Sequence, residues 1–255
     1  MKEYCINELN CRMRYYDFPG NDIPILFFHG LGCAGSFDYP QVVVQSELEG
    51  HRRILVDLLG AGYSDKPENF DYSVHSHVSY LKSFIDSLDI NEYILFGHSL
   101  GGPVAIELAK LCGNHVRALI LSESNLDPSK DGASSYQIAQ FCEGEFIARQ
   151  FAQLITESAL HGNTMWAATL SNCSPLAIYR LSKCALHGGN PSWRTLLYGL
   201  PVQKGFIFGE KSLPDRDYEE LQRHNIHVEI VPAAGHSMAW ENPKGLAIAI
   251  SRCLK

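Results

Sequence analysis

Short runs of apolar residues, each about the length of a β-strand, recur along the chain and alternate with longer segments of helical spacing. The strand-like runs are YCINEL, RMRYYDF, IPILFFH, RRILVD, EYILFG, VRALILS, KGFIFG and IHVEIV. One helical segment carries Val74, Val78, Leu81, Ile85 and Leu88 on one face. This alternation predicts an α/β fold with a largely parallel sheet and helices on both faces. The first two runs are close enough in sequence to pair as a hairpin.

The alternation stops between residues 125 and 200, where only helical patterns occur. The first of them is marked by Ile138, Phe141, Ile147, Phe151, Leu154 and Ile155. Two further helices are predicted to open at Ser174-Pro175 and at Asn190-Pro191, with proline in the first helical position. A block of helices inserted in this way is typical of a lid. We therefore predict a core formed by residues 1–124 and 201–255, with a helical cap over residues 125–200.

Composition and charge narrow the class of protein. The chain has 255 residues, of which 45% are hydrophobic, and this is enough for a large core. With 21 basic against 28 acidic residues, a net charge of -7 and no dense basic run, a nucleic-acid partner is not expected. No apolar run approaches the ~20 residues that cross a bilayer, and the start lacks a signal-peptide core. We expect a soluble, cytoplasmic protein whose eight cysteines, without a C-x-x-C pair, are reduced.

The run GHSLGG places Ser99 between a predicted strand and a predicted helix. Gly97, Ser99 and Gly101 fit the pattern G-x-S-x-G, in which a tight turn lifts a nucleophilic serine above the edge of the sheet. The N–H of Leu100 would then lie at a helix N-terminus, where it can bind an oxyanion. The alternative interpretation is a serine that only caps the helix.

A serine hydroxyl needs a base, and His236 is the histidine best placed to serve. It follows the last predicted strand, at the edge of the sheet where Ser99 emerges. His98 is expected to point elsewhere, because neighbours in a tight turn diverge. The glycine-rich loop after IPILFF offers a second oxyanion donor, most simply the N–H of Leu31. The pairs His75/His77 and His224/His227 lack further ligands, so no metal site is predicted.

Four motifs together resemble the α/β-hydrolase fold superfamily: HGLG, DLLGAGYSDKP, GHSLGG and GHSMAWENP, in this order and spread over the whole chain. The resemblance implies an eight-stranded, mostly parallel sheet with a helical cap inserted after strand six. It also implies a Ser–His–acid triad that works without metal or organic cofactor.

The acid of this triad departs from the usual family pattern. The run FGEKSLPD has Ser212 where members usually carry an aspartate, and Asp215 stands three residues further on. Glu123, directly after strand six, is similar in position to the acid of haloalkane dehalogenases and coelenterazine-type luciferases. We favour Glu123 and keep Asp215 as the alternative. Ser99 at the turn argues against dehalogenase chemistry, which uses a carboxylate nucleophile in this superfamily.

Two other classes of function compete with hydrolysis. The glycines at positions 30, 32 and 35 fit G-x-G-x-x-G with Asp57 after the next strand, but Pro40 would fall inside the helix that a dinucleotide-binding turn requires. A ligand-binding or signalling protein on the same scaffold is the second alternative. We predict a carboxylesterase-like serine hydrolase that cleaves a small-molecule ester or a related acyl compound. The substrate is expected to be mostly apolar, because the predicted lid is rich in large apolar residues: Phe141, Phe146, Phe151, Met165, Trp166, Tyr179 and Trp193.

Overall fold

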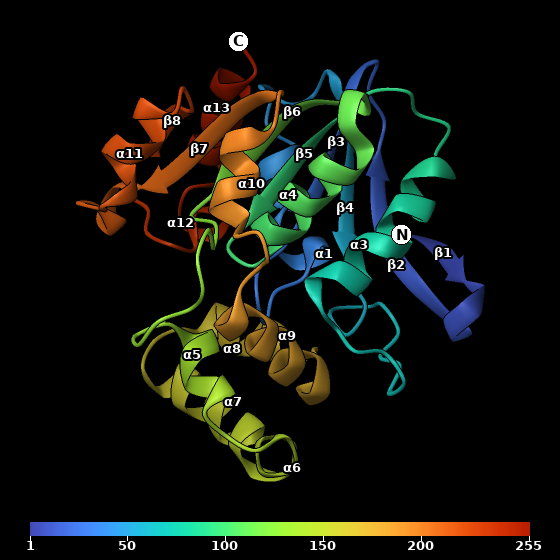
Figure 1. The fold of residues 1–255 in the computed structure, drawn as a ribbon, viewed down its shortest axis with the longest axis vertical. Helices are drawn as coiled ribbons and strands as arrows, with labels where there is room; N and C mark the ends of the chain where they lie inside the picture. Colours follow the sequence, from blue (N-terminus) through green and yellow to red (C-terminus); the bar gives the residue numbers. More distant parts are fainter.

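All eight strand-like runs form strands of one sheet in the computed structural model, which describes residues 1–255. The spatial order is β1-β2-β4-β3-β5-β6-β7-β8 (Figure 1). β1 and β2 form the predicted antiparallel hairpin, β2 runs antiparallel to β4, and every other pair is parallel. The strands are β1 (Lys2–Ile6), β2 (Cys11–Phe18), β3 (Asp22–Phe28), β4 (His51–Asp57), β5 (Tyr93–His98), β6 (Val116–Ser122), β7 (Gln203–Gly209) and β8 (His227–Val231). The predicted fold class is confirmed.

Both faces of the sheet are covered, and successive residues of the central strands enter different clusters. Ile25 and Phe27 of β3 belong to one buried cluster, and Leu26 and Phe28 belong to the other. Strands that are buried on both sides read as continuous apolar runs, which is why the central strands lack polar alternation. One face carries α3 (Val74–Asp86), α4 (Gly101–Cys112), α10 (Trp193–Gly199) and α11 (Asp217–Arg223), and the other carries α1 (Gly35–Asp38), α2 (Pro40–Val43), α12 (Met238–Glu241) and α13 (Pro243–Cys253).

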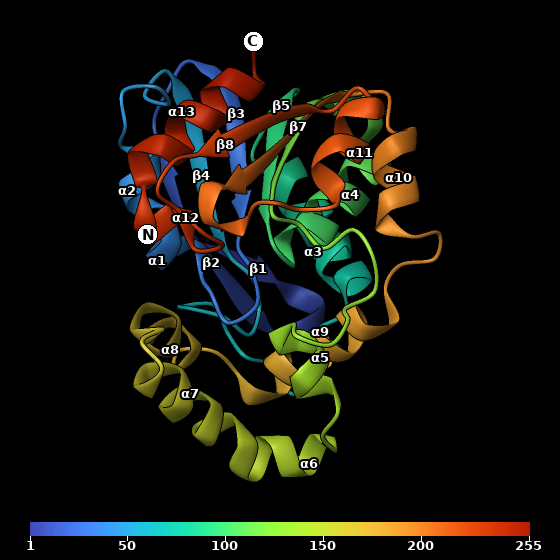
Figure 2. The same ribbon diagram turned by 90° about the vertical axis from the view of Figure 1, so that its left-hand side faces the viewer.

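The predicted helical cap after the sixth strand is present. Figures 1 and 2 show α5 to α9 as a separate layer beyond the ends of the parallel strands, and we call these helices the cap layer. It consists of α5 (Ser134–Ala139), α6 (Glu143–Glu145), a π-helical turn (Phe146–Gln150), α7 (Phe151–Leu160), α8 (Thr164–Leu170) and α9 (Pro175–His187). A buried apolar cluster joins the layer to Leu31, Ala61 and Leu100 of the core, while α10 packs against α4 beside the sheet. The division of the chain at residues 125 and 200 stays a prediction.

Helix starts follow the capping chemistry of the sequence, with one difference. Pro175 opens α9 as predicted, and the Ser174 side chain accepts a hydrogen bond from the N–H of Ala177. The helix predicted at Pro191 begins instead at Trp193, because Ser192 supplies the capping oxygen. Short 3-10 turns occupy Asn7–Leu9, Gly113–His115 and Glu210–Ser212. None of the helices is both long enough and apolar enough to cross a bilayer.

Candidate active site

Ser99 occupies the turn between β5 and α4 with a φ of 51°, in the left-handed region that serine rarely adopts. Glycines on either side make this turn possible. A β-carbon on Gly97 would come within 2.6 Å of the Gly101 carbonyl oxygen, and one on Gly101 would collide with the backbone of Phe28. The motif therefore reflects close packing of β5, α4 and β3, and it leaves the serine at the carboxyl edge of the sheet.

Backbone hydrogen bonds hold Ser99 in this conformation. Its N–H donates to the Ser122 carbonyl at 3.0 Å. Its carbonyl accepts from the N–H of Gly102 at 3.0 Å and from the N–H of Asn125 at 3.3 Å. The turn is thus attached to the chain that follows β6.

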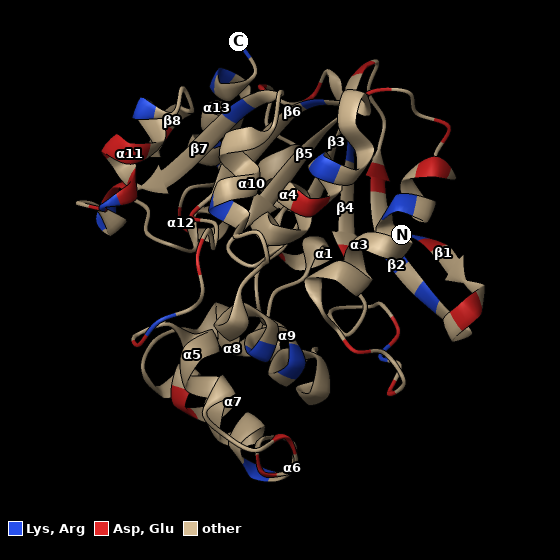
Figure 3. Cartoon of the chain, in the orientation of Figure 1, with Lys and Arg blue, Asp and Glu red and all other residues tan.

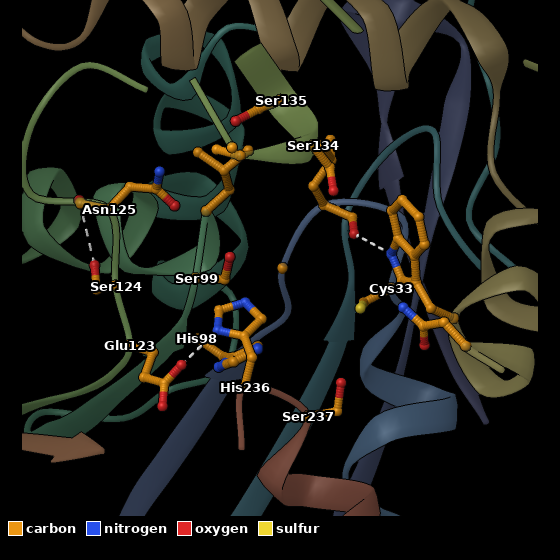
Figure 4. A pocket seen from close by; sticks show the side chains of 17 residues that line it. Cys33, His98, Ser99, Glu123, Ser124, Asn125, Ser134, Ser135, His236 and Ser237 are labelled. Carbon is orange, nitrogen blue, oxygen red and sulfur yellow. Dashed lines mark hydrogen bonds and ion pairs between the residues drawn. The ribbon is translucent and has the colours of Figure 1, made fainter. Parts of the chain in front are cut away.

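His236 and Glu123 meet at the same edge, as predicted from the sequence. His236 follows β8, Glu123 follows β6, and the His236 Nδ1 lies 2.7 Å from Glu123 Oε2. The other carboxylate oxygen accepts the N–H of Gly209 at 2.8 Å. Figure 4 shows the His236 ring between the Glu123 carboxylate and Ser99. The Glu123 side chain is 11% exposed and that of His236 is 54% exposed, so the pair opens toward solvent on the histidine side.

The electrostatics of Glu123 favour its ionised form. Burial alone would raise its pKa, but hydrogen bonds from His236, Gly209 and Ser212, together with the charge of His236, hold the pKa below its ordinary value. Ser212, in the 3-10 turn after β7, contributes to this stabilisation of the carboxylate.

The alternative acid, Asp215, lies apart from this cavity. Its carboxylate accepts the N–H of Asp217 at 2.7 Å and lines a different surface depression. It is therefore a turn residue at the start of α11. Of the two candidates, the structure brings only Glu123 to His236.

Ser99 and His236 line one cavity of ≈ 460 Å³, but no hydrogen bond joins them. Catalytic hydrogen bonds in ligand-free enzymes are often long and tighten with substrate. The two side chains lie at the same edge of the sheet and line the same cavity, so a ligand bound there would lie beside both.

The two predicted oxyanion donors also border this cavity. Leu31 and Leu100 are nearly buried, and their N–H groups donate to no backbone or side-chain acceptor. Buried N–H groups almost always have partners, so two without one at the border of this cavity are the candidates for binding an oxyanion.

Helix α8 holds the loop that carries Leu31, a contact that the sequence did not reveal. The Trp166 Nε1–H donates to the Leu31 carbonyl at 2.8 Å, and the Thr169 hydroxyl donates to the Gly32 carbonyl at 2.8 Å. These partners are 135 and 137 residues apart. No local pattern marks such a pair, so only the fold could identify it.

One expectation about the lining of the cavity is wrong. His98 does not point away: it lines the cavity and its ring lies 4.6 Å from that of His236. Of the large apolar residues noted in the sequence of the cap, Trp166 lines the cavity. The others build apolar clusters or lie exposed: Phe141, Phe146, Phe151, Met165, Tyr179 and Trp193.

The residues of the dinucleotide-binding alternative have structural roles. Gly35 opens the four-residue α1, and Pro40 stands in the first turn of α2. Asp57 is fully buried and accepts hydrogen bonds from the N–H and hydroxyl of Ser36 and from the N–H of Tyr63. It braces the loop after β4.

Known proteins resemble parts of this sequence. Residues 23–142 match the family described as alpha/beta hydrolase fold. The chain is 31% identical over 113 residues to haloalkane dehalogenase 2 of Mycobacterium tuberculosis, covering 44% of this chain and 38% of that protein. It is 31% identical over 99 residues to 2-hydroxy-6-oxo-2,4-heptadienoate hydrolase of Pseudomonas putida, covering 38% of this chain and 36% of that protein. The match thus spans less than two fifths of the length of these curated relatives.

Solved structures resemble the whole chain. A thermophilic esterase from Thermogutta terrifontis has a TM-score of 0.79 at 19% identity, over 100% of this chain and 98% of that one. A bromoperoxidase from Bacillus anthracis has a TM-score of 0.79 at 17% identity, over 99% of both chains. Similarity at this level of identity establishes the fold.

Proposed function

We propose that this chain, a member of the α/β-hydrolase fold superfamily, is a serine hydrolase that works through an acyl-enzyme. The observation that carries the proposal is the 2.7 Å contact between His236 Nδ1 and Glu123 at the cavity that Ser99 lines. A carboxylate on Nδ1 fixes the proton there, and it leaves Nε2 free to accept the proton of a serine hydroxyl.

The chemistry follows from these positions. Ser99 Oγ attacks the substrate carbonyl carbon while His236 Nε2 takes the hydroxyl proton. The N–H groups of Leu31 and Leu100 bind the oxygen that becomes negative. His236 then gives its proton to the leaving group, and an acyl ester on Ser99 remains. A water molecule, deprotonated by His236, attacks this ester, and the acid product leaves with Ser99 restored.

The nucleophile distinguishes this chemistry from that named for one relative. Dehalogenation in this superfamily uses a carboxylate at the turn, whereas this chain has Ser99 there. A serine forms an acyl-enzyme with an ester, an amide or a ketone, so both carboxylester and carbon–carbon bond hydrolysis use the same residues. Carboxylester hydrolysis is the simplest of these activities and is the one we propose.

Active-site labelling tests the proposal. We expect a fluorophosphonate probe to modify wild-type protein at Ser99, as located by peptide mass spectrometry, and to leave Ser99→Ala unmodified. Ser124→Ala, which alters another serine of the same cavity, should still be labelled. Absence of labelling and of ester turnover in folded wild-type protein would refute the proposal and favour a ligand-binding protein.

A further inference from the structure

The cavity beside Ser99 is lined mainly by polar groups, and several of them have no partner within the protein. Only five of its seventeen lining residues are hydrophobic. The side chains of Ser134, Asn163 and Ser237 all line it, and none of the three makes a hydrogen bond to the rest of the chain. Figure 4 shows the Ser134 hydroxyl directed into the cavity from the start of α5. These groups are available to a ligand.

No lysine or arginine faces this cavity, and the only group in its lining that the proposed mechanism charges is the catalytic His236. Glu123 is its only acidic side chain. Burial, together with the charge of His236, lowers the pKa of His98 to about 3, so His98 is neutral near pH 7. Lysines and arginines are spread over other parts of the fold (Figure 3). Lys130, for example, lines a separate depression.

We propose that the substrate is a neutral acyl compound that carries hydrogen-bonding groups such as hydroxyl, ether or amide, and that neither a purely apolar nor an anionic acyl group is preferred. This inference rests on the proposed serine hydrolase function. It differs from the apolar substrate expected from the sequence, and from the carboxylate named for the Pseudomonas putida relative.

The preference follows from how each kind of substrate would change the hydrogen bonds and charge interactions of the residues that line the cavity. Ser134 and Asn163 are exposed to water in the free protein. An apolar acyl chain that covered either side chain would displace this water without replacing its hydrogen bonds, at a cost on the order of 10-fold in binding for each covered group. An anionic acyl group would lie near the Glu123 carboxylate with no lysine or arginine in the lining to bind it. A neutral group with acceptors and donors meets neither penalty.

A set of three 4-nitrophenyl esters tests the substrate class. The butyrate is apolar, the methoxyacetate has the same shape with an ether oxygen, and the hemiglutarate carries a carboxylate. Each kcat/KM is divided by the rate constant for alkaline hydrolysis of the same ester, which removes differences in intrinsic reactivity. We expect the corrected value for methoxyacetate to exceed that for butyrate about 10-fold, on the order of one hydrogen bond. The hemiglutarate should rank last.

Variants of the cavity wall sharpen the test. Asn163→Leu should reduce the corrected preference for methoxyacetate over butyrate, and it removes no helix cap, because the Asn163 side chain makes none. Ser134→Arg should raise kcat/KM for the hemiglutarate about 10-fold or more relative to butyrate. Ser171→Arg, which adds the same charge at an exposed position outside the cavity, should not.

The outcomes separate the two proposals. Turnover that depends on Ser99 but favours butyrate or the hemiglutarate would overturn the substrate class and leave the serine mechanism standing. No turnover that depends on Ser99, with any of the three esters and without fluorophosphonate labelling, would overturn both.

Discussion

Replacing Glu123 with glutamine changes one oxygen to an NH2 group and should disable His236. Both carboxylate oxygens are acceptors: one takes the N–H of Gly209 at 2.8 Å, and the other faces His236 Nδ1 at 2.7 Å. A glutamine must therefore turn its NH2 group toward one of these donors. If it faces His236, the imidazole shifts its proton to Nε2 and cannot accept one from Ser99. If it faces Gly209, a backbone N–H loses its partner.

The size of the effect follows from the charge that is lost. Two unit charges about 4 Å apart interact by roughly 4 kcal/mol at the effective dielectric constant of a protein surface. At 1.36 kcal/mol for each tenfold change, this corresponds to about 10³ in rate. His236 is 54% exposed, so water screens part of the interaction. We expect kcat for Glu123→Gln to fall roughly 10²- to 10³-fold.

The assay is steady-state hydrolysis of 4-nitrophenyl methoxyacetate, with Asp215→Asn as the matched control because Asp215 lies outside the cavity. The control should keep kcat within about twofold of wild type. The pKa of Glu123 is lowered, so its carboxylate is ionised throughout an assay at pH 8. A larger loss in Asp215→Asn than in Glu123→Gln would refute the assignment.

Three further predictions concern the loop, the buried acid and α8. A methyl group on Gly30 would lie 3.0 Å from Ser99 Cβ, so Gly30→Ala should lower kcat/KM at least 10-fold. The control Gly144→Ala, whose added methyl group would have no atom within 4 Å, should leave kcat/KM unchanged, and equal effects of the two substitutions would contradict this prediction. Burial raises the pKa of Asp38 to about 8, so the folded state holds a proton that the unfolded state releases, and wild-type stability falls as pH rises from about 4 to 8. In urea unfolding, the free energy of unfolding of Asp38→Asn minus that of wild type should increase by about 1.4 kcal/mol for each pH unit between pH 5 and 8. A difference that does not change with pH would show that the Asp38 carboxyl is ionised in the folded protein. Trp166→Phe removes the hydrogen bond to the Leu31 carbonyl, so kcat should fall about 10-fold with little change in KM, and unchanged kinetics would show that this contact does not hold the loop.

The sheet and the meeting of Glu123 with His236 could be predicted because their determinants are local. Each strand is a contiguous apolar run, and parallel strands place their carboxyl ends at one edge. Glu123, directly after β6, and His236, in the loop after β8, are therefore expected at the edge where Ser99 follows β5. The tight turn around Ser99 is also local, since it depends on glycines within two residues.

The lining of the cavity could not be predicted, because helical spacing identifies a buried face without saying what buries it. Phe146 and Tyr179 are large apolar residues of the kind that could line a pocket. Their rings instead lie 5.8 Å apart within the apolar cluster of the cap layer. Ser134 and Asn163 have no periodic pattern, and they reach the cavity only through the path of the chain between helices. The position of His98 likewise depended on a loop more than a hundred residues later in the sequence.

The acid's place after β6 has a consequence for protein engineering. Glu123 and Asn125, which contacts the Ser99 carbonyl, belong to the same connecting segment that leads from the sheet into the cap layer. An exchange of cap layers between relatives would therefore have to keep this leading segment intact, since a splice at residue 122 would remove the partner of His236 along with the transplanted helices. The returning segment before β7 contributes nothing to the cavity and can serve as the other splice point.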